Sequence, residues 1–105
     1  MIGIGVDLVE VERMRTALAR TPTLVDRLFT ADEQAYAQAA RDPAERFSVR
    51  FAAKEAAMKA LGVGLGAVDW HDIEVAKTTA GAPELRVTGR ALERAVDAGI
   101  TRWLV

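Results

Sequence analysis

The chain has 105 residues, of which half are apolar and 28% are charged, and its formal net charge is -1. This composition is typical of one globular domain spanning residues 1–105, and the near-neutral charge argues against a nonspecific nucleic-acid-binding protein. There is no cysteine, which excludes disulfides, thiol catalysis and zinc–cysteine sites.

The N-terminal residues lack the basic region and the long apolar run of a signal peptide. Charged residues interrupt every apolar stretch elsewhere, so no segment resembles a membrane span. We therefore expect a cytoplasmic protein with no membrane contact and no nucleic-acid partner.

Residues 2–9 alternate between apolar side chains and small or polar ones, which predicts a strand. Gly3 and Gly5 leave one face of this strand bare, as expected where a ligand must approach the backbone closely. Asp7 lies at the end of the bare face. Asp7 is equally well explained as the cap of the helix expected next, but a cap does not explain the two glycines.

The middle of the chain is dominated by helical patterns. The sequence T-A-D-E from Thr30 is a capping box, which favours a helix start, and Gly62 is a natural helix stop. The predicted segments are a helix over 10–20, a short turn or helix over 24–29, and helices over 30–41 and 43–61.

Residues 72–76 and 84–88 alternate and predict a hairpin-like antiparallel pair. A further helix is expected over 89–98, and a last strand begins near Ile100. Strands at both ends of a helical middle predict an α+β fold, with a small antiparallel sheet packed against helices.

The helix over 43–61 places a carboxylate in an apolar environment. Its helical spacing gives two neighbouring rows, one of Phe47, Phe51, Glu55 and Lys59, the other of Arg46, Arg50 and Lys54.

A carboxylate beside two phenylalanines is poorly hydrated unless a cation or a donor compensates it. Magnesium takes oxygen ligands, so Asp7 and Glu55 are candidate metal ligands, with the basic row available to clamp a phosphate. The ordinary alternative is an ion pair between Glu55 and Lys59 on a solvated helix face.

Two further features carry weaker signals. The glycine-rich residues 62–66 do not match the phosphate-binding loop motif and follow a helix, so a helix stop with a connector is the favoured interpretation. The basic bias of residues 12–29 suits an acidic partner, although a solvated helix face is the commoner explanation.

Four motifs follow one another across nearly the whole chain: G-I-G-V-D-L-V-E-V-E-R at 3–13, F-A-A-K-E-A at 51–56, D-I-E-V at 72–75 and G-A-P-E-L at 81–85. In this order they resemble holo-acyl-carrier-protein synthase, the small bacterial type of 4'-phosphopantetheinyl transferase. The resemblance implies an enzyme of fatty acid biosynthesis. It would transfer phosphopantetheine from coenzyme A to a serine of apo acyl carrier protein and release adenosine 3',5'-bisphosphate.

The resemblance also implies roles for individual residues. Asp7 and Glu55 would bind magnesium, and Lys59 would lie at the reacting phosphate. Arg13, and with it Arg20, would contact the acidic carrier protein. The candidates for contacts with coenzyme A are Arg50, Lys54, Gly62 and Gly64. The base that takes the serine proton stays open between Glu55, a metal-bound water and another group.

The family is expected to act as a homotrimer with active sites between neighbouring subunits. Its members usually continue with a strand that carries a histidine, whereas this sequence stops at Val105. We therefore expect a C-terminally short form and a longer natural one. The alternative is a noncatalytic trimeric module that binds coenzyme A or the carrier protein, and a third hypothesis is a metal-dependent nucleotide phosphohydrolase. Which carrier protein is modified stays open.

Overall fold

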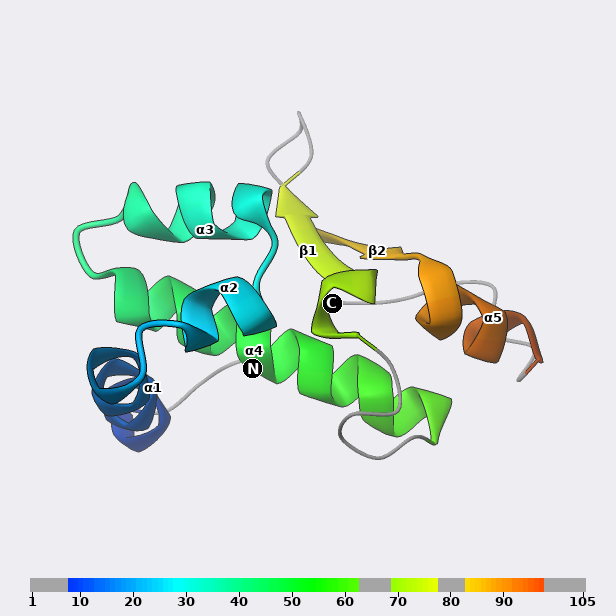
Figure 1. Cartoon of the computed structure of the whole chain (residues 1–105), viewed down its shortest axis with the longest axis horizontal. Coiled ribbons are helices and arrows are strands. Elements are labelled where there is room, and N and C mark those ends of the chain that lie inside the picture. The colour runs from blue at the N-terminus through cyan, green and yellow to red at the C-terminus, as the bar shows by residue number, and fades with distance from the viewer. Residues whose placement is uncertain (1–7, 63–68, 78–82, 98–105) are drawn as a thin grey trace.

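A computed structural model describes residues 8–62, 69–77 and 83–97. Over these ranges the chain forms helices and one two-stranded antiparallel sheet, which confirms the predicted α+β class (Figure 1). None of the described helices is long and apolar enough to cross a lipid bilayer. The elements, in chain order, are α1 (Leu8–Arg20), α2 (Leu24–Leu28), α3 (Ala31–Gln38), α4 (Pro43–Leu61), the 3-10 helix η1 (Trp70–Asp72), β1 (Ile73–Lys77), β2 (Pro83–Val87) and α5 (Gly89–Asp97).

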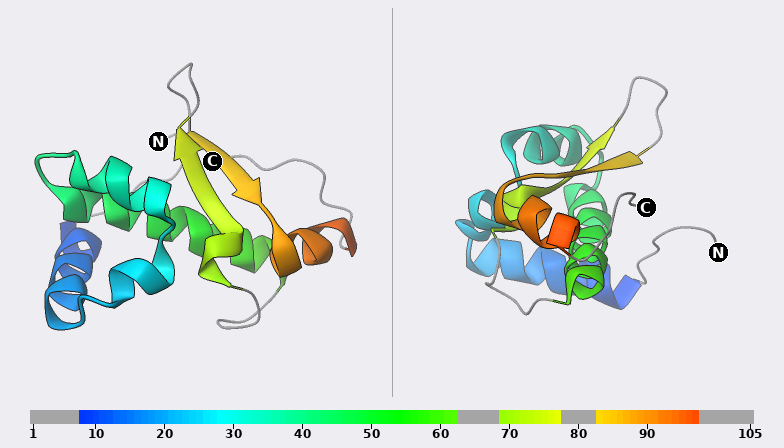
Figure 2. Two further views of the ribbon diagram at one scale, coloured as in Figure 1. Left: turned by 45° about the horizontal axis from the view of Figure 1, so that its top comes forward. Right: turned by 90° about the vertical axis from the view of Figure 1, so that its right-hand side faces the viewer.

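Helix α4 runs through the middle of the molecule, and its first half packs against the preceding helices (Figures 1 and 2). Met14, Phe29, Ala37 and Phe47 form the buried cluster here, drawn from α1, the end of α2, α3 and α4. The rings of Phe29 and Phe47 lie 4.6 Å apart between centroids at a tilted angle of 42°. Burial of these apolar side chains is what holds the short helices in place, because helices of this length are marginal alone.

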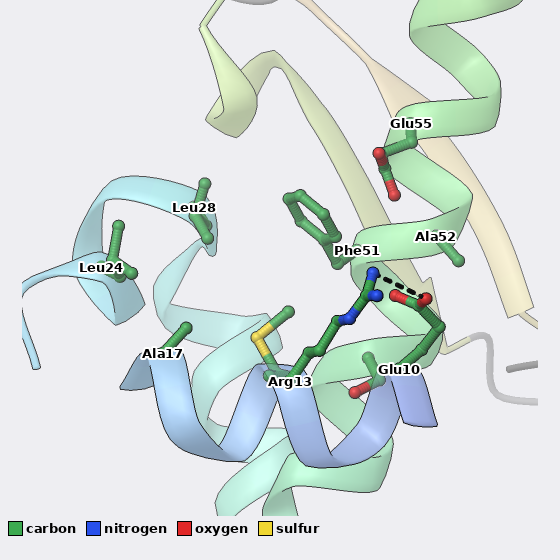
Figure 3. A pocket seen from close by; sticks show the side chains of 10 residues that line it. Glu10, Arg13, Ala17, Leu24, Leu28, Phe51, Ala52 and Glu55 are labelled. Carbon is green, nitrogen blue, oxygen red and sulfur yellow. Dashed lines mark hydrogen bonds and ion pairs between the residues drawn. The ribbon is translucent and has the colours of Figure 1, made fainter. Parts of the chain in front are cut away.

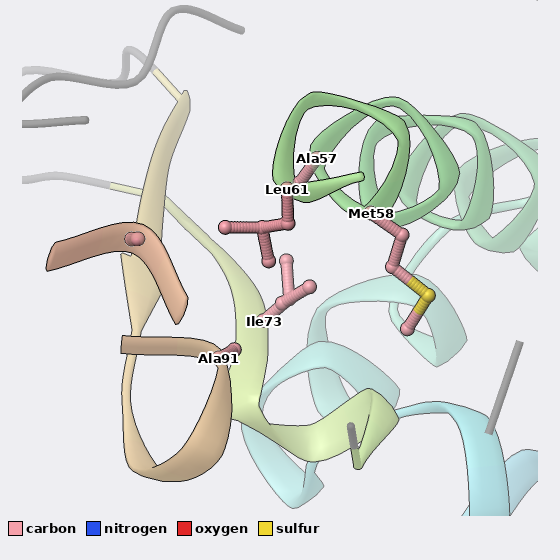
Figure 4. Close-up of a cluster of buried hydrophobic side chains, with 6 residues drawn as sticks. Ala57, Met58, Leu61, Ile73 and Ala91 are labelled. Atoms are coloured by element: carbon pink, nitrogen blue, oxygen red, sulfur yellow. The ribbon is translucent and has the colours of Figure 1, made fainter. Parts of the chain in front are cut away.

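The second half of α4 packs against the hairpin and α5 through a second buried cluster (Figure 4). Its members are Ala57, Met58, Leu61, Ile73, Ala91 and Ala95. In the sheet, Ile73 pairs with Val87 and Val75 with Leu85, so the alternation seen in the sequence turns Ile73 and Val75 toward the core.

Most predicted elements in the described ranges are confirmed to within a few residues. The exception is the N-terminal strand over 2–9, whose last two residues, Leu8 and Val9, are the first turn of α1. That part of the prediction is wrong, because the heptad-like spacing of Val11, Met14 and Leu18 extends the helix backwards. Residues 2–7 and the strand expected from Ile100 lie outside the described residues.

The predicted helix start at Thr30 and the predicted helix stop at Gly62 are both confirmed. The Thr30 side chain accepts from the Glu33 backbone N–H at 3.2 Å, and the Glu33 carboxylate accepts from the Thr30 backbone N–H at 2.8 Å. This is a complete capping box at the start of α3. At the other end of the long helix, Gly62 adopts a left-handed conformation with φ 69° and ends α4.

Gly62→Ala is expected to destabilise the fold by about 1 kcal/mol, because an L side chain is strained in the left-handed region. No atom of the described residues is found within 4 Å of the position a Cβ would take, so the expected cost is backbone strain. Gly62→Asn is the matched control, since asparagine tolerates this conformation, and it should lose less. Urea unfolding of the three proteins measures the difference, and equal stability of both variants would contradict this account.

Candidate active site

A pocket of about 500 Å³ opens between α1, α2 and α4 (Figure 3). Its walls are mostly apolar, and charged side chains from α1 and α4 stand along them. The lining residues are Glu10, Arg13, Met14, Ala17, Leu24, Leu28, Ser48, Phe51, Ala52 and Glu55.

Glu55 is the predicted metal ligand that this pocket contains. Figure 3 shows its carboxylate and the Phe51 ring projecting from α4 toward the space bounded by α1 and α2. Glu55 is half-buried and makes no hydrogen bond or ion pair with any other described residue, Lys59 included. The alternative interpretation, an ion pair between Glu55 and Lys59, is therefore wrong for this helix. An uncommitted carboxylate on an apolar wall is suited to binding a cation or accepting a proton.

Glu10 is a second carboxylate at the pocket, one for which no role was predicted from the sequence. It lies in the first turn of α1, where its Oε1 accepts from Arg13 Nη1 at 3.3 Å (Figure 3). A signal for this placement was available, because Glu10, Arg13 and Ala17 follow helical spacing and share one side of α1. The two carboxylates bring negative charge to the pocket from both of its longer helices.

Lys54 lies elsewhere, fully buried with no exposed surface. Its ammonium lies 2.8 Å from Glu33 Oε1 and donates to the Trp70 carbonyl oxygen at 2.8 Å. Burial lowers the pKa of Lys54, and the hydrogen bond and charge of Glu33 oppose that shift. A buried ammonium with these partners is shielded from ligands at the surface, so its burial argues against the coenzyme A contact predicted for Lys54.

Arg50 is also buried, with 7% of its surface exposed. Its guanidinium lies 3.9 Å from the centre of the Tyr36 ring, and burial lowers the pKa of Arg50. It borders a second hollow, of about 290 Å³, that Arg86 also lines. Glu55 follows Arg50 by five positions, which turns the two side chains about 140° apart around α4. The two residues therefore face different sides of α4.

The remaining candidates are spread along the surface. Lys59 is exposed one helical turn beyond Glu55, and Gly62 ends the same helix. Arg13 and Arg20 are exposed on α1, with 73% of the Arg13 side chain accessible. Asp7 and Gly64 lie outside the described residues.

The described residues include no group of three or more His, Cys, Asp or Glu side chains that could hold a metal ion. Magnesium in phosphate chemistry commonly needs only one or two carboxylates, with substrate phosphates and waters as its other ligands. The uncommitted oxygens of Glu55 fit that donor set.

Comparison with known proteins identifies the family. The family model described as the 4'-phosphopantetheinyl transferase superfamily matches residues 3–102. The holo-[acyl-carrier-protein] synthase of Frankia casuarinae is 46% identical over 103 residues, covering 98% of this chain and 82% of the relative. That of Moorella thermoacetica is 41% identical over 100 residues, covering 95% and 78%. The chain belongs to the 4'-phosphopantetheinyl transferase superfamily and is an enzyme of the transferase class.

Solved structures of holo-[acyl-carrier-protein] synthases share the fold. The Neisseria meningitidis protein matches with a TM-score of 0.74 at 34% identity, over 95% of this chain and 82% of that one. A Bacillus anthracis synthase in complex with coenzyme A (3',5'-ADP) matches with a TM-score of 0.62 at 34% identity, over 84% and 76%. The Chronobacterium ammoniagenes complex with coenzyme A matches at 0.74 and 27% identity, over 91% and 78%.

Proposed function

We propose that the chain is a holo-[acyl-carrier-protein] synthase that moves the 4'-phosphopantetheine group of coenzyme A onto a serine of an apo acyl carrier protein. Its family and its relatives support this reaction. The observation in the structure that carries the proposal is Glu55, a carboxylate without a partner among the described residues, on the wall of a pocket.

The reaction exchanges one phosphorus–oxygen bond for another. The serine hydroxyl oxygen bonds to the phosphorus that carries the pantetheine, and the bond from that phosphorus to the bridging pyrophosphate oxygen breaks. The serine proton goes to a base, and the bridging oxygen leaves with adenosine 3',5'-bisphosphate. Such transfers depend on positioning and charge stabilisation more than on covalent help from the protein.

Glu55 and Asp7 are the residues that would hold a magnesium ion. When bound there, the ion would neutralise pyrophosphate charge and polarise the phosphorus that is attacked. As a carboxylate on the pocket wall, Glu55 is also one candidate for the base that takes the serine proton. Lys59, one turn further along α4, would contribute positive charge to the leaving phosphate.

The position of Arg50 relative to Glu55 favours an active site that is shared between subunits. Because Arg50 and Glu55 point to different sides of α4, one subunit cannot easily bring both to the same coenzyme A. In a cyclic homotrimer, the Arg50 side of one subunit would meet the Glu55 side of the next, as heterologous interfaces require. We propose this arrangement, with Gly62 and Gly64 as further candidates for coenzyme A contacts and the cytoplasm as the site of action.

The test of the function is to incubate the chain with coenzyme A, magnesium and an apo acyl carrier protein, then weigh the carrier by mass spectrometry. A gain of one phosphopantetheine that disappears with a chelator is the expected result. Coenzyme A binding with no mass gain would instead favour the noncatalytic module. Nucleotide hydrolysis without a carrier would favour the phosphohydrolase.

The outer side of α1 is the proposed docking surface for the carrier protein. Arg13 and Arg20 border a shallow hollow of about 610 Å³ along this helix, beside Leu8 and Val9, which are exposed apolar side chains. Basic groups around exposed apolar ones suit an acidic protein that also buries some apolar surface.

Arg13→Glu is therefore expected to raise the KM for the carrier protein by roughly tenfold or more at low salt, because it places like charges together. The difference from the wild type should shrink as salt is added, since exposed charges are screened. Arg90→Glu, an exposed position on α5, is the charge-matched control and should change little. An equal effect of both variants would indicate that only net charge matters.

A further inference from the structure

The buried pair of Lys54 and Glu33 joins four elements of the fold. The Glu33 carboxylate on α3 accepts from Lys54 on α4, from the Thr30 backbone and, through Oε2, from the Val75 backbone of β1 at 2.9 Å. Lys54 in turn donates to the Trp70 carbonyl of η1. Neither side chain is exposed, so the charged groups of Lys54 and Glu33 are shielded from water.

Between the two apolar clusters, the bonds of Lys54 constrain how α4 is rotated about its own axis. The segment from Ala52 to Ala57 contains four alanines, whose methyl groups offer neighbouring elements little to interlock with. Lys54 is the long buried side chain of this segment, and its ammonium bonds at two fixed points. Because successive residues turn by about 100°, holding Lys54 inward also sets the direction of Glu55.

Lys54 also holds the pocket wall beside Glu55. The Trp70 ring, whose backbone carbonyl Lys54 binds, is stacked on Phe51 with centroids 5.0 Å apart and an angle of 26°. Phe51 lines the same pocket as Glu55 and lies one turn before it. The buried ammonium of Lys54 thus constrains both the Glu55 carboxylate and the Phe51 ring next to it.

We infer that Lys54 and Glu33 are positioning residues for the transfer reaction, which hold Glu55 and the pocket wall in the reactive arrangement through a buried ion pair. Lys54 touches neither substrate in this assignment. The inference rests on the proposed function, since it takes Glu55 as the carboxylate of the reacting site.

The test compares Lys54→Met and Glu33→Gln with the wild type in two measurements. The first is kcat per folded molecule, which should fall roughly tenfold to a hundredfold because a small misplacement of a reacting group is costly. The second is binding of Mn²⁺ to the protein alone, followed by electron paramagnetic resonance, which should weaken roughly tenfold or more. Glu55→Gln gives the reference for a lost ligand.

Ile73→Val and Ile73→Ala are the stability controls, because Ile73 is fully buried in the second cluster and its side chain does not line the pocket. The two Ile73 variants should lower the free energy of unfolding without changing any contact of Glu55. Their kcat and Mn²⁺ affinity should therefore stay at the wild-type level. Wild-type values for Lys54→Met, or an equal loss in an Ile73 variant of matched stability, would overturn the inference.

Failure of the variants to fold and failure of the proposed function can be distinguished from failure of this inference. If the Lys54 and Glu33 single variants do not fold, the apolar double variant Glu33→Leu with Lys54→Met takes their place, since replacing both partners removes the unpaired charge. If the wild type fails to modify any carrier, the proposed function fails. The Mn²⁺ measurement still decides whether Lys54 sets the position of Glu55.

Discussion

Glu55→Gln is expected to lower kcat for phosphopantetheine transfer by about 10²- to 10⁴-fold, the range associated with loss of a positioned acid–base group. Loss of a metal ligand acts in the same direction, because charge on the pyrophosphate would be less well stabilised. Glutamine keeps the shape of the side chain and removes its negative charge. The expected loss is therefore chemical and not steric.

The stability of this variant should stay close to that of the wild type. Glu55 makes no hydrogen bond or ion pair with a described residue, so folding gains little from its carboxylate. Glu45→Gln, an exposed position in the first turn of the same helix, is the isosteric control and should keep full activity. The measurement is the initial rate of carrier modification over a magnesium titration. A Glu55→Gln enzyme with the wild-type rate and magnesium dependence would remove Glu55 from the site.

Glu33→Ala is expected to cost about 3–5 kcal/mol of unfolding free energy, the range for breaking a buried ion pair from one side. The change leaves the Lys54 ammonium buried without its carboxylate and removes the acceptor of two backbone N–H groups, those of Thr30 and Val75. A domain of this size has a total stability of roughly 5–15 kcal/mol, so the variant should melt far below the wild type.

Urea unfolding of the single and double variants separates charge from packing. Adding Lys54→Met to Glu33→Ala should restore part of the lost stability, because the uncompensated charge is then gone. Asp32→Ala, the exposed neighbour in the first turn of α3, should lose only about 0.3–1 kcal/mol. A loss in Glu33→Ala no larger than that of Asp32→Ala would mean that the buried pair contributes little.

Local signals in the sequence predicted most of the described fold. The capping box at Thr30, the stop at Gly62 and the alternation in the two hairpin strands each depend on a few adjacent residues, so they can be read without knowing the rest. The alternation at the N-terminus predicted a strand that included Leu8 and Val9, and this was wrong. Both residues belong to α1, whose apolar side chains follow helical spacing.

The site was predicted less completely, and for a physical reason. Helical spacing placed Glu55 correctly on a row with Phe51, but it placed Lys54 on a basic row as though all charged residues were exposed. Whether a lysine is buried depends on a partner from another element, here Glu33, and no spacing within α4 reveals that partner. For the same reason, Glu10 was identified only once α1 and α4 were brought together around the pocket.

The division of the buried side chains into two clusters has a consequence for cooperativity. The clusters share no residue, and α4 is the helix that contributes to both. Such an arrangement favours two local unfolding units, one of α1–α3 with the start of α4, the other of the hairpin and α5 with its end. The Lys54 bonds to Glu33 and Trp70 cross the boundary between the two units. The amides most protected from hydrogen exchange should therefore lie in the middle of α4, where opening either unit alone does not release them.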